Sequence, residues 1–218
     1  GGSILIAMGI DGTFAIPDGQ GYEDFIYSFY DSPDERKAEA RERAVWAVEI
    51  MKRMIDAGAE VLYNCSDYCF NTGPFLPPDM FEEFIFPFLR YQTIELRRAG
   101  AWVIKHTDGN MLPILEMLIE SGPHAIHSID PVAGMDIREI KTRCRGRVAG
   151  MGNVNTSYLQ TGPAEAVRRS AEYALTNGMP GGAYIYSSCN SIFEGIPLDN
   201  YQAMLEVREE HGYYSKEY

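Results

Sequence analysis

Short apolar runs alternate along the chain with longer segments in which apolar residues recur at helical spacing. Six runs have the length of a buried strand, and they cover residues 4–10, 60–63, 101–105, 125–129, 147–151 and 183–186. The helical segments begin at Ser32-Pro33 and at Pro77-Pro78, and the later ones cover residues 111–120, 137–143, 163–176 and 198–210. Regular alternation of strands and helices predicts parallel βα units, and therefore an α/β fold in one domain.

The number of strands leaves two parallel architectures open. A closed eight-stranded barrel needs two more strands than the six apolar runs, whereas an open doubly wound sheet needs only five or six. The first run is not followed by a GxGxxG or GxxxxGK[ST] sequence. The chain therefore lacks the nucleotide-binding motif that an open sheet usually carries, which argues against the open sheet.

Composition and charge narrow the class of partner. The chain has 218 residues, of which 45% are hydrophobic, and 19 basic against 31 acidic residues give a net charge of -12. This charge argues against nucleic acid and anionic membranes and favours a small-molecule substrate. The four cysteines form no CxxC pair, and no apolar run approaches the roughly 18 residues of a membrane helix, so we expect a cytoplasmic protein. The sequence lacks an initiator Met, which suggests that it is part of a longer protein.

Polar residues follow every predicted strand. The six strand ends carry Asp11, Asn64 to Tyr68, His106 to Asn110, His127 to Pro131, Gly152 to Asn155, and Ser187 to Ser191. The carboxyl ends of parallel strands share one face, which therefore becomes the predicted site.

His106 and Asp108 form the strongest candidate pair at that face. Asp, Asn and Ser also serve as helix caps, and Asn110 could cap the next helix in this way. No capping role requires His106, and a spacing of two residues puts both side chains on the same side of an extended strand. For His127 and Cys189, core packing and ligand binding both remain open.

Five segments together resemble one known family. They are GPFLPPDMFEEFIFPFL at residues 73–89, HTDGN at 106–110, HSIDPVAGMD at 127–136, GMGNVN at 150–155 and SSCNSIFEGIPLDNYQAM at 187–204. The chain resembles the uroporphyrinogen decarboxylase superfamily, which also contains cobamide-dependent methyltransferases of anaerobes. The resemblance implies a TIM-barrel-like fold in which residues 1–218 form a single domain with six of the eight strand-helix units, the two N-terminal units being absent.

The residues favour the methyltransferase branch. The decarboxylases of the family bind their polycarboxylate tetrapyrrole with Arg and Asp from the first two units, and no Arg lies at any of the six strand ends here. The methyltransferases commonly bind zinc through an H-x-C motif and a later Cys. The resemblance therefore implies zinc or another divalent metal at His106, Asp108 and Cys189, with His106 and Asp108 as the catalytic residues. A carboxylate in place of the first thiolate suits an oxygen or nitrogen methyl donor at least as well as a thiol.

The resulting hypothesis is a methyltransferase that acts on a small methylated compound and uses a corrinoid supplied by a partner protein. The residues assigned to the substrate pocket are Asn64, Asp67, Tyr68, His127, Asn153 and Asn190. Two alternatives stay open: a decarboxylase of a tetrapyrrole, and a non-catalytic protein that binds a corrinoid or tetrapyrrole. The first and last strands would be unpaired edges, so we also expect a homo-oligomer.

Overall fold

The computed structural model describes every residue except 1–3, 18, 20 and 215–218. Six strands correspond to the six predicted ones: β1 (Ala7–Gly9), β2 (Val61–Asn64), β5 (Trp102–His106), β6 (Ala125–His127), β7 (Ala149–Val154) and β8 (Tyr184–Ser188). β1 pairs with β2, β2 with β5, and β7 with β8, all in parallel. Helices separate these strands along the chain, so the predicted α/β fold of the TIM-barrel-like class is confirmed.

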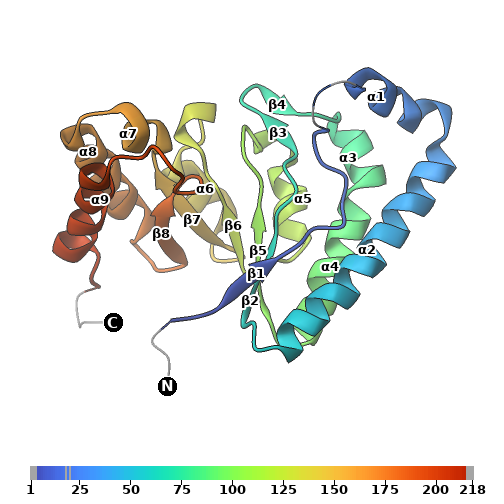
Figure 1. Cartoon of the computed structure of the whole chain (residues 1–218), viewed down its shortest axis with the longest axis horizontal. Helices are drawn as coiled ribbons and strands as arrows, with labels where there is room; N and C mark the ends of the chain where they lie inside the picture. Colours follow the sequence, from blue (N-terminus) through green and yellow to red (C-terminus); the bar gives the residue numbers. More distant parts are fainter. Residues whose placement is uncertain (1–3, 18, 20, 215–218) are drawn as a thin grey trace. The chain divides into compact units, whose positions relative to one another are not determined.

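The chain divides into two compact units, residues 1–125 and 126–218. The helices of the first unit are α1 (Tyr22–Asp31), α2 (Pro33–Asp56), α3 (Pro78–Phe84), α4 (Phe86–Arg98) and α5 (Leu115–Glu120), the last preceded by the 3-10 turn η1 (Leu112–Ile114). α2 and α4 run side by side (Figure 1), and Lys52 on α2 donates to Glu95 on α4 at 3.0 Å. Both helices bury apolar side chains against the strands, and this core includes Met51, Leu62, Leu96 and Val103. Burial of these faces fixes β2 and β5 as a rigid base for the residues that follow them.

The second unit contains α6 (Ile137–Cys144), α7 (Thr156–Thr161), α8 (Ala164–Gly178), α9 (Leu198–His211) and the 3-10 turn η2 (Pro131–Ala133). Its core packs α8 and α9 on β7 through residues that include Val154, Leu159, Val167, Leu175 and Val207. The prediction of one barrel domain over residues 1–218 stays a prediction.

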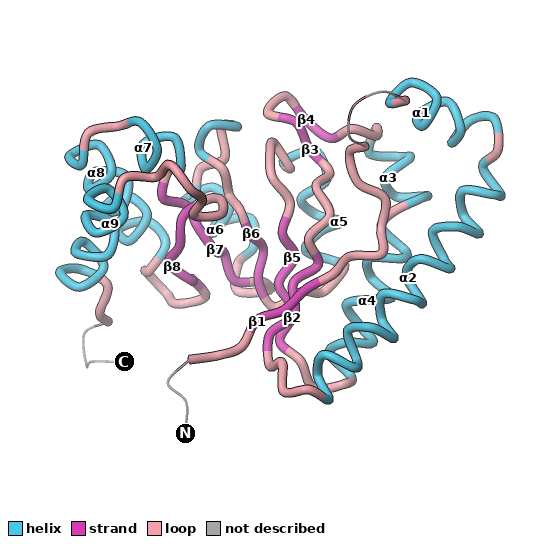
Figure 2. Tube along the Cα trace, viewed as in Figure 1, coloured by secondary structure: helices cyan, strands magenta, loops and turns pink. Residues whose placement is uncertain are grey.

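Several elements differ from those predicted. The structure adds α1, α7 and a short antiparallel hairpin of β3 (Cys69–Phe70) and β4 (Gly73–Pro74), drawn in magenta in Figure 2. The helix predicted to begin at Pro77-Pro78 is interrupted at Ile85, where α3 ends and α4 begins. Pro87 explains the break, because proline has no N–H for the helix and its ring clashes with the preceding turn. Ser32 precedes α2 as predicted, but its side chain makes no capping hydrogen bond.

Among the described residues, no helix combines the length and the apolar character needed to cross a membrane.

Candidate metal centre

Three side chains converge in the first unit, at the carboxyl ends of β2 and β5. The Nε2 atom of His106 lies 3.4 Å from Oδ1 of Asp67 and 3.6 Å from Oδ1 of Asp108. One ligand atom from each residue falls within 4.8 Å of the other two, and no other group of this kind occurs in the part of the chain that the structure describes. Because β2 and β5 are parallel neighbours, their ends deliver Asp67 and the other two residues to the same edge.

The turn after β5 explains the abrupt end of this apolar strand. Asp108 donates its main-chain N–H to Oδ1 of Asp67 at 3.0 Å, which joins the two strand ends. Gly109 has a φ of 79°, in the left-handed region that favours glycine. Asn110 then accepts the N–H of Leu112 through its side-chain oxygen at 3.1 Å, but the N-cap of η1 is Met111 and makes no side-chain capping hydrogen bond, so the prediction that Asn110 caps the next helix is wrong. The segment HTDGN therefore places His106 and Asp108 together and turns the chain directly behind them.

The contacts of Asp67 favour its charged form. Burial alone would raise the pKa of this carboxyl group, but hydrogen bonds from His106 and from the main chain of Asp108 lower the pKa below its ordinary value. An ionised carboxylate is the form that ligates a cation. The side chains of His106, Asp67 and Asp108 are 17%, 46% and 32% exposed, whereas the Oδ1 atom of Asp108 itself is buried. Asp67 is therefore the most exposed member of the group.

The donor set and its spacing fit a divalent metal. Imidazole nitrogen and carboxylate oxygen are ligands of zinc and of other first-row divalent metals. Two ligands at zinc-bonding distance in a tetrahedral site lie about 3.3 Å apart. The distances of 3.4 and 3.6 Å from His106 are close to this value. Asp67, which the sequence assigned to the substrate pocket, is thus the third member of the group.

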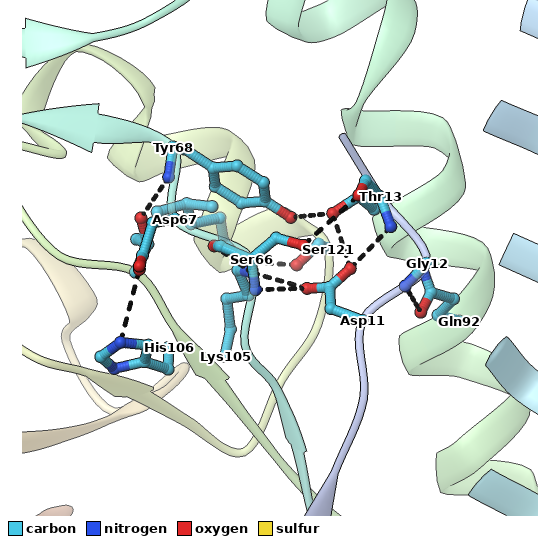
Figure 3. Close-up of polar contacts among 12 residues, drawn as sticks. Asp11, Gly12, Thr13, Ser66, Asp67, Tyr68, Gln92, Lys105, His106 and Ser121 are labelled. Carbon is cyan, nitrogen blue, oxygen red and sulfur yellow. Dashed lines mark hydrogen bonds and ion pairs between the residues drawn. The ribbon is translucent and has the colours of Figure 1, made fainter. Parts of the chain in front are cut away.

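A buried ion pair beneath this group was missed by the sequence analysis. Lys105 on β5 is fully buried and lies 2.8 Å from Oδ2 of Asp11, which follows β1 (Figure 3). Burial alone would raise the pKa of Asp11, but Lys105 and the hydrogen bonds of Thr13 lower this pKa to about 2. Burial lowers the pKa of Lys105, and Asp11 partly offsets this effect. The one feature of the sequence that could have predicted this ion pair is Asp11, a charged residue directly after a strand, because a carboxylate that becomes buried there needs a charged partner.

Two residues assigned to the substrate pocket lie inside the first unit. Asn64 is fully buried, and neither polar atom of its side chain has a hydrogen-bond partner among the described residues. Tyr68 is also fully buried, and its hydroxyl group lies 2.6 Å from Oγ1 of Thr13. Asn64 therefore keeps unused hydrogen-bonding capacity, whereas Tyr68 is held by Thr13 next to the candidate metal centre.

The other candidate residues belong to the second unit. His127 donates from Nε2 to the carbonyl of Ser188 at 3.1 Å. Asn153 lines a cavity of about 710 Å³ and donates to the carbonyl of Met135 at 3.5 Å. The side-chain oxygen of Asn190 accepts the N–H of the following residue at 2.6 Å. The roles of these three residues in substrate binding stay predictions.

Cys189 is held by hydrogen bonds within the second unit. Its sulfur lies 3.2 Å from Oγ1 of Thr156 and 3.5 Å from Oδ1 of Asp130. Burial raises the pKa of the thiol to about 11, which disfavours the thiolate that would ligate a metal. The part of Cys189 in metal binding stays a prediction.

The fold and the candidate metal centre together define a class: an α/β protein of parallel strand-helix units with a polar site at the strand ends. Residues 15–211 match the profile of the uroporphyrinogen decarboxylase (URO-D) family, and the chain belongs to this family. Among solved structures, a methyltransferase from Methanosarcina mazei is similar, with a TM-score of 0.79 at 21% sequence identity. The match covers 98% of this chain and 60% of that one, so this chain spans less than two thirds of the similar structure. A search of curated proteins found no match.

Proposed function

We propose that this protein transfers a methyl group from a small methylated compound to a corrinoid carried by a partner protein. The observation that carries the proposal is the convergence of Asp67, His106 and Asp108 within 4.8 Å at the strand ends. Membership in a family that includes methyltransferases supports it, as does the likeness in fold to a methyltransferase from Methanosarcina mazei.

The three side chains would hold a divalent metal, which when bound would polarise the heteroatom that carries the methyl group. Asp67 stays ionised through the hydrogen bonds from His106 and Asp108, and the partial exposure of all three residues leaves room for the substrate. Two carboxylates and one imidazole form a harder donor set than thiolates do. We therefore propose a methyl ether or a methylated amine as the donor, rather than a thioether.

Metal binding is tested first, because the rest of the proposal depends on it. Protein purified without chelator and then loaded with zinc or cobalt should hold about one metal ion per chain by elemental analysis. His106→Ala should lose most of the metal, whereas Asp108→Asn and Asp67→Asn should bind it at least roughly tenfold more weakly. His211→Ala is the matched control, because this histidine is exposed at the end of α9.

Two results would contradict metal binding. One is wild-type protein that holds no stoichiometric metal, and the other is full occupancy in all three site variants. His106 and Asp108 would then be reassigned to hydrogen bonding of an organic ligand. If metal binds, methyl transfer is tested with cob(I)alamin as acceptor and a panel of methyl ethers and methylamines, and the absorbance of methylcob(III)alamin is followed. Turnover that persists in metal-free His106→Ala would contradict a role of the metal in the reaction.

A further inference from the structure

Lys105 is a buried cation that makes two hydrogen bonds and one cation–π contact within the first unit. Its ammonium group donates to Oδ2 of Asp11 at 2.8 Å and to the carbonyl of Ser66 at 2.9 Å. It also lies 4.0 Å from the centre of the Tyr68 ring, at the distance of a cation–π contact. The side chains of Lys105 and Asp11 are 0% and 3% exposed, so this ion pair has no direct access to a substrate.

The carboxylate of Asp11 completes the same network. Its Oδ1 accepts the N–H and the hydroxyl of Thr13 at 2.8 and 2.6 Å, and its Oδ2 accepts the N–H of Ser66 at 3.1 Å. Both main-chain groups of Ser66 are therefore held by the ion pair, the N–H by Asp11 and the carbonyl by Lys105 (Figure 3). Ser66 immediately precedes Asp67, so this network fixes the chain on one side of the proposed ligand.

The residue on the other side of Asp67 is fixed as well. The main-chain N–H of Tyr68 donates to Oγ1 of Thr107 at 2.8 Å, and Thr107 stands between His106 and Asp108. The hydroxyl of Tyr68 contacts Thr13, which also donates to Asp11. The short segment that carries Asp67 is thus tied at both ends to β5 and to the chain after β1.

A role in stability alone does not account for the ion pair. Two buried charges lose their hydration, and replacing such a pair with apolar residues of similar size is often neutral or stabilising. The placement of the two charges indicates a geometric role, because their hydrogen bonds converge on Ser66, the residue next to Asp67. We propose that Asp11 and Lys105 are positioning residues, which hold the carboxylate of Asp67 within ligation distance of His106 and Asp108.

This inference rests on the proposed metal centre, and it is tested with the double variant Asp11→Asn/Lys105→Met. The double variant removes both charges together, so that neither is left buried without a partner, and it nearly preserves the side-chain volumes. We expect it to keep a thermal transition close to that of wild type and to bind Co(II) at least tenfold more weakly. We also expect its Co(II) absorption spectrum to change, because the spectrum reports the geometry of the ligands.

The matched control removes a different ion pair of the same unit. Lys52→Met/Glu95→Gln eliminates the 3.0 Å contact between α2 and α4, which no hydrogen bond connects to Asp67. This control should bind Co(II) with wild-type affinity and spectrum. A purely structural role of Asp11 and Lys105 would lower the thermal transition while leaving the affinity and spectrum of the folded protein unchanged.

The outcomes separate this inference from the metal centre itself. Absence of Co(II) binding in the wild-type protein contradicts the proposed function, before any variant is considered, and the inference fails with it. Wild-type affinity and spectrum in the folded double variant contradict the positioning role while the metal centre stands. If the double variant does not fold, Asp11→Asn replaces it, since the amide keeps the size of the carboxylate and removes the charge that holds Lys105 and Ser66. Weaker Co(II) binding in folded Asp11→Asn supports the positioning role, and unchanged binding overturns it.

Discussion

The ion pair of Asp11 and Lys105 makes the stability of the protein depend on pH in the acid range. The pKa of Asp11 is lowered from 3.8 to about 2 in the folded protein, so the folded state binds fewer protons than the unfolded state between these values. The stabilisation is therefore complete above about pH 4 to 5 and is lost as the pH falls towards 2. A shift of this size corresponds to about 2 kcal/mol.

This prediction is checked by measuring the free energy of unfolding of wild type and of Asp11→Asn/Lys105→Met between pH 6 and pH 2. The difference between the two proteins should change by about 2 kcal/mol over this range, with wild type losing more on acidification. A difference that stays constant with pH would show that Asp11 titrates alike in the folded and unfolded states.

At the level of single residues, the sequence identified His106 and Asp108 but not Lys105 or the place of Asp67. The pair was recognisable because two polar side chains end an apolar strand at a spacing of two. Lysine is almost never fully buried without a partner, and that partner, Asp11, is 94 positions away in the sequence. The approach of Asp67 to His106 depends on contacts between separate strand ends, such as that of Tyr68 with Thr107, which no local pattern encodes.

At the level of elements, the hairpin of β3 and β4 packs against the turn that carries His106 and Asp108 of the candidate metal centre. Asn110 donates its main-chain N–H to the carbonyl of Phe70 on β3 at 2.9 Å. A Cβ atom at Gly109 would lie 2.3 Å from the carbonyl oxygen of Cys69, also on β3. Gly109 is therefore required both by its positive φ and by the close approach of the hairpin.

Comparing Gly109→Ala with Gly134→Ala separates the effect of the positive φ from that of the close approach of the hairpin. Gly134 has nearly the same φ, 78° against 79°, but a Cβ atom there would meet nothing within 4 Å. Gly134→Ala should cost about 1 to 2 kcal/mol through backbone strain alone. Gly109→Ala should cost more in the free energy of unfolding and should weaken metal binding, because the hairpin or the turn must move. Equal losses of stability in the two variants, with metal binding intact in both, would contradict the packing role.

The strands were predicted more closely than the helices around them. Each buried strand has a continuous apolar run that local sequence makes visible, as for Val103 and Ile104 in β5. The hairpin was missed because its strands have only two residues each and include Gly73 and Pro74, which are typical of turns. The sequence of α7, TSYLQT, has one buried apolar residue, Leu159, and so gives almost no helical period.

At the level of the whole molecule, the balance of charge bears on which branch of the family the protein represents. The net charge is -12, and no Arg lies at any of the six strand ends. The buried cation next to the candidate metal centre, Lys105, is already paired with Asp11. Negative charges at Asp67 and Asp108 would repel a ligand with many carboxylates, whereas a neutral methylated compound or a metal ion meets no such barrier.

Binding of a tetrapyrrole octacarboxylate should therefore be weak. We expect a Kd in the millimolar range or above, equivalent to about -4 kcal/mol or less favourable, since each carboxylate would lose water without gaining a cationic partner. Fluorescence titration with uroporphyrin, repeated at low and high salt, measures this affinity directly. Any residual binding should strengthen as salt screens the repulsion. Micromolar binding that weakens with added salt would instead reveal cationic contacts. Such binding together with decarboxylation of uroporphyrinogen would favour a decarboxylase over a methyltransferase.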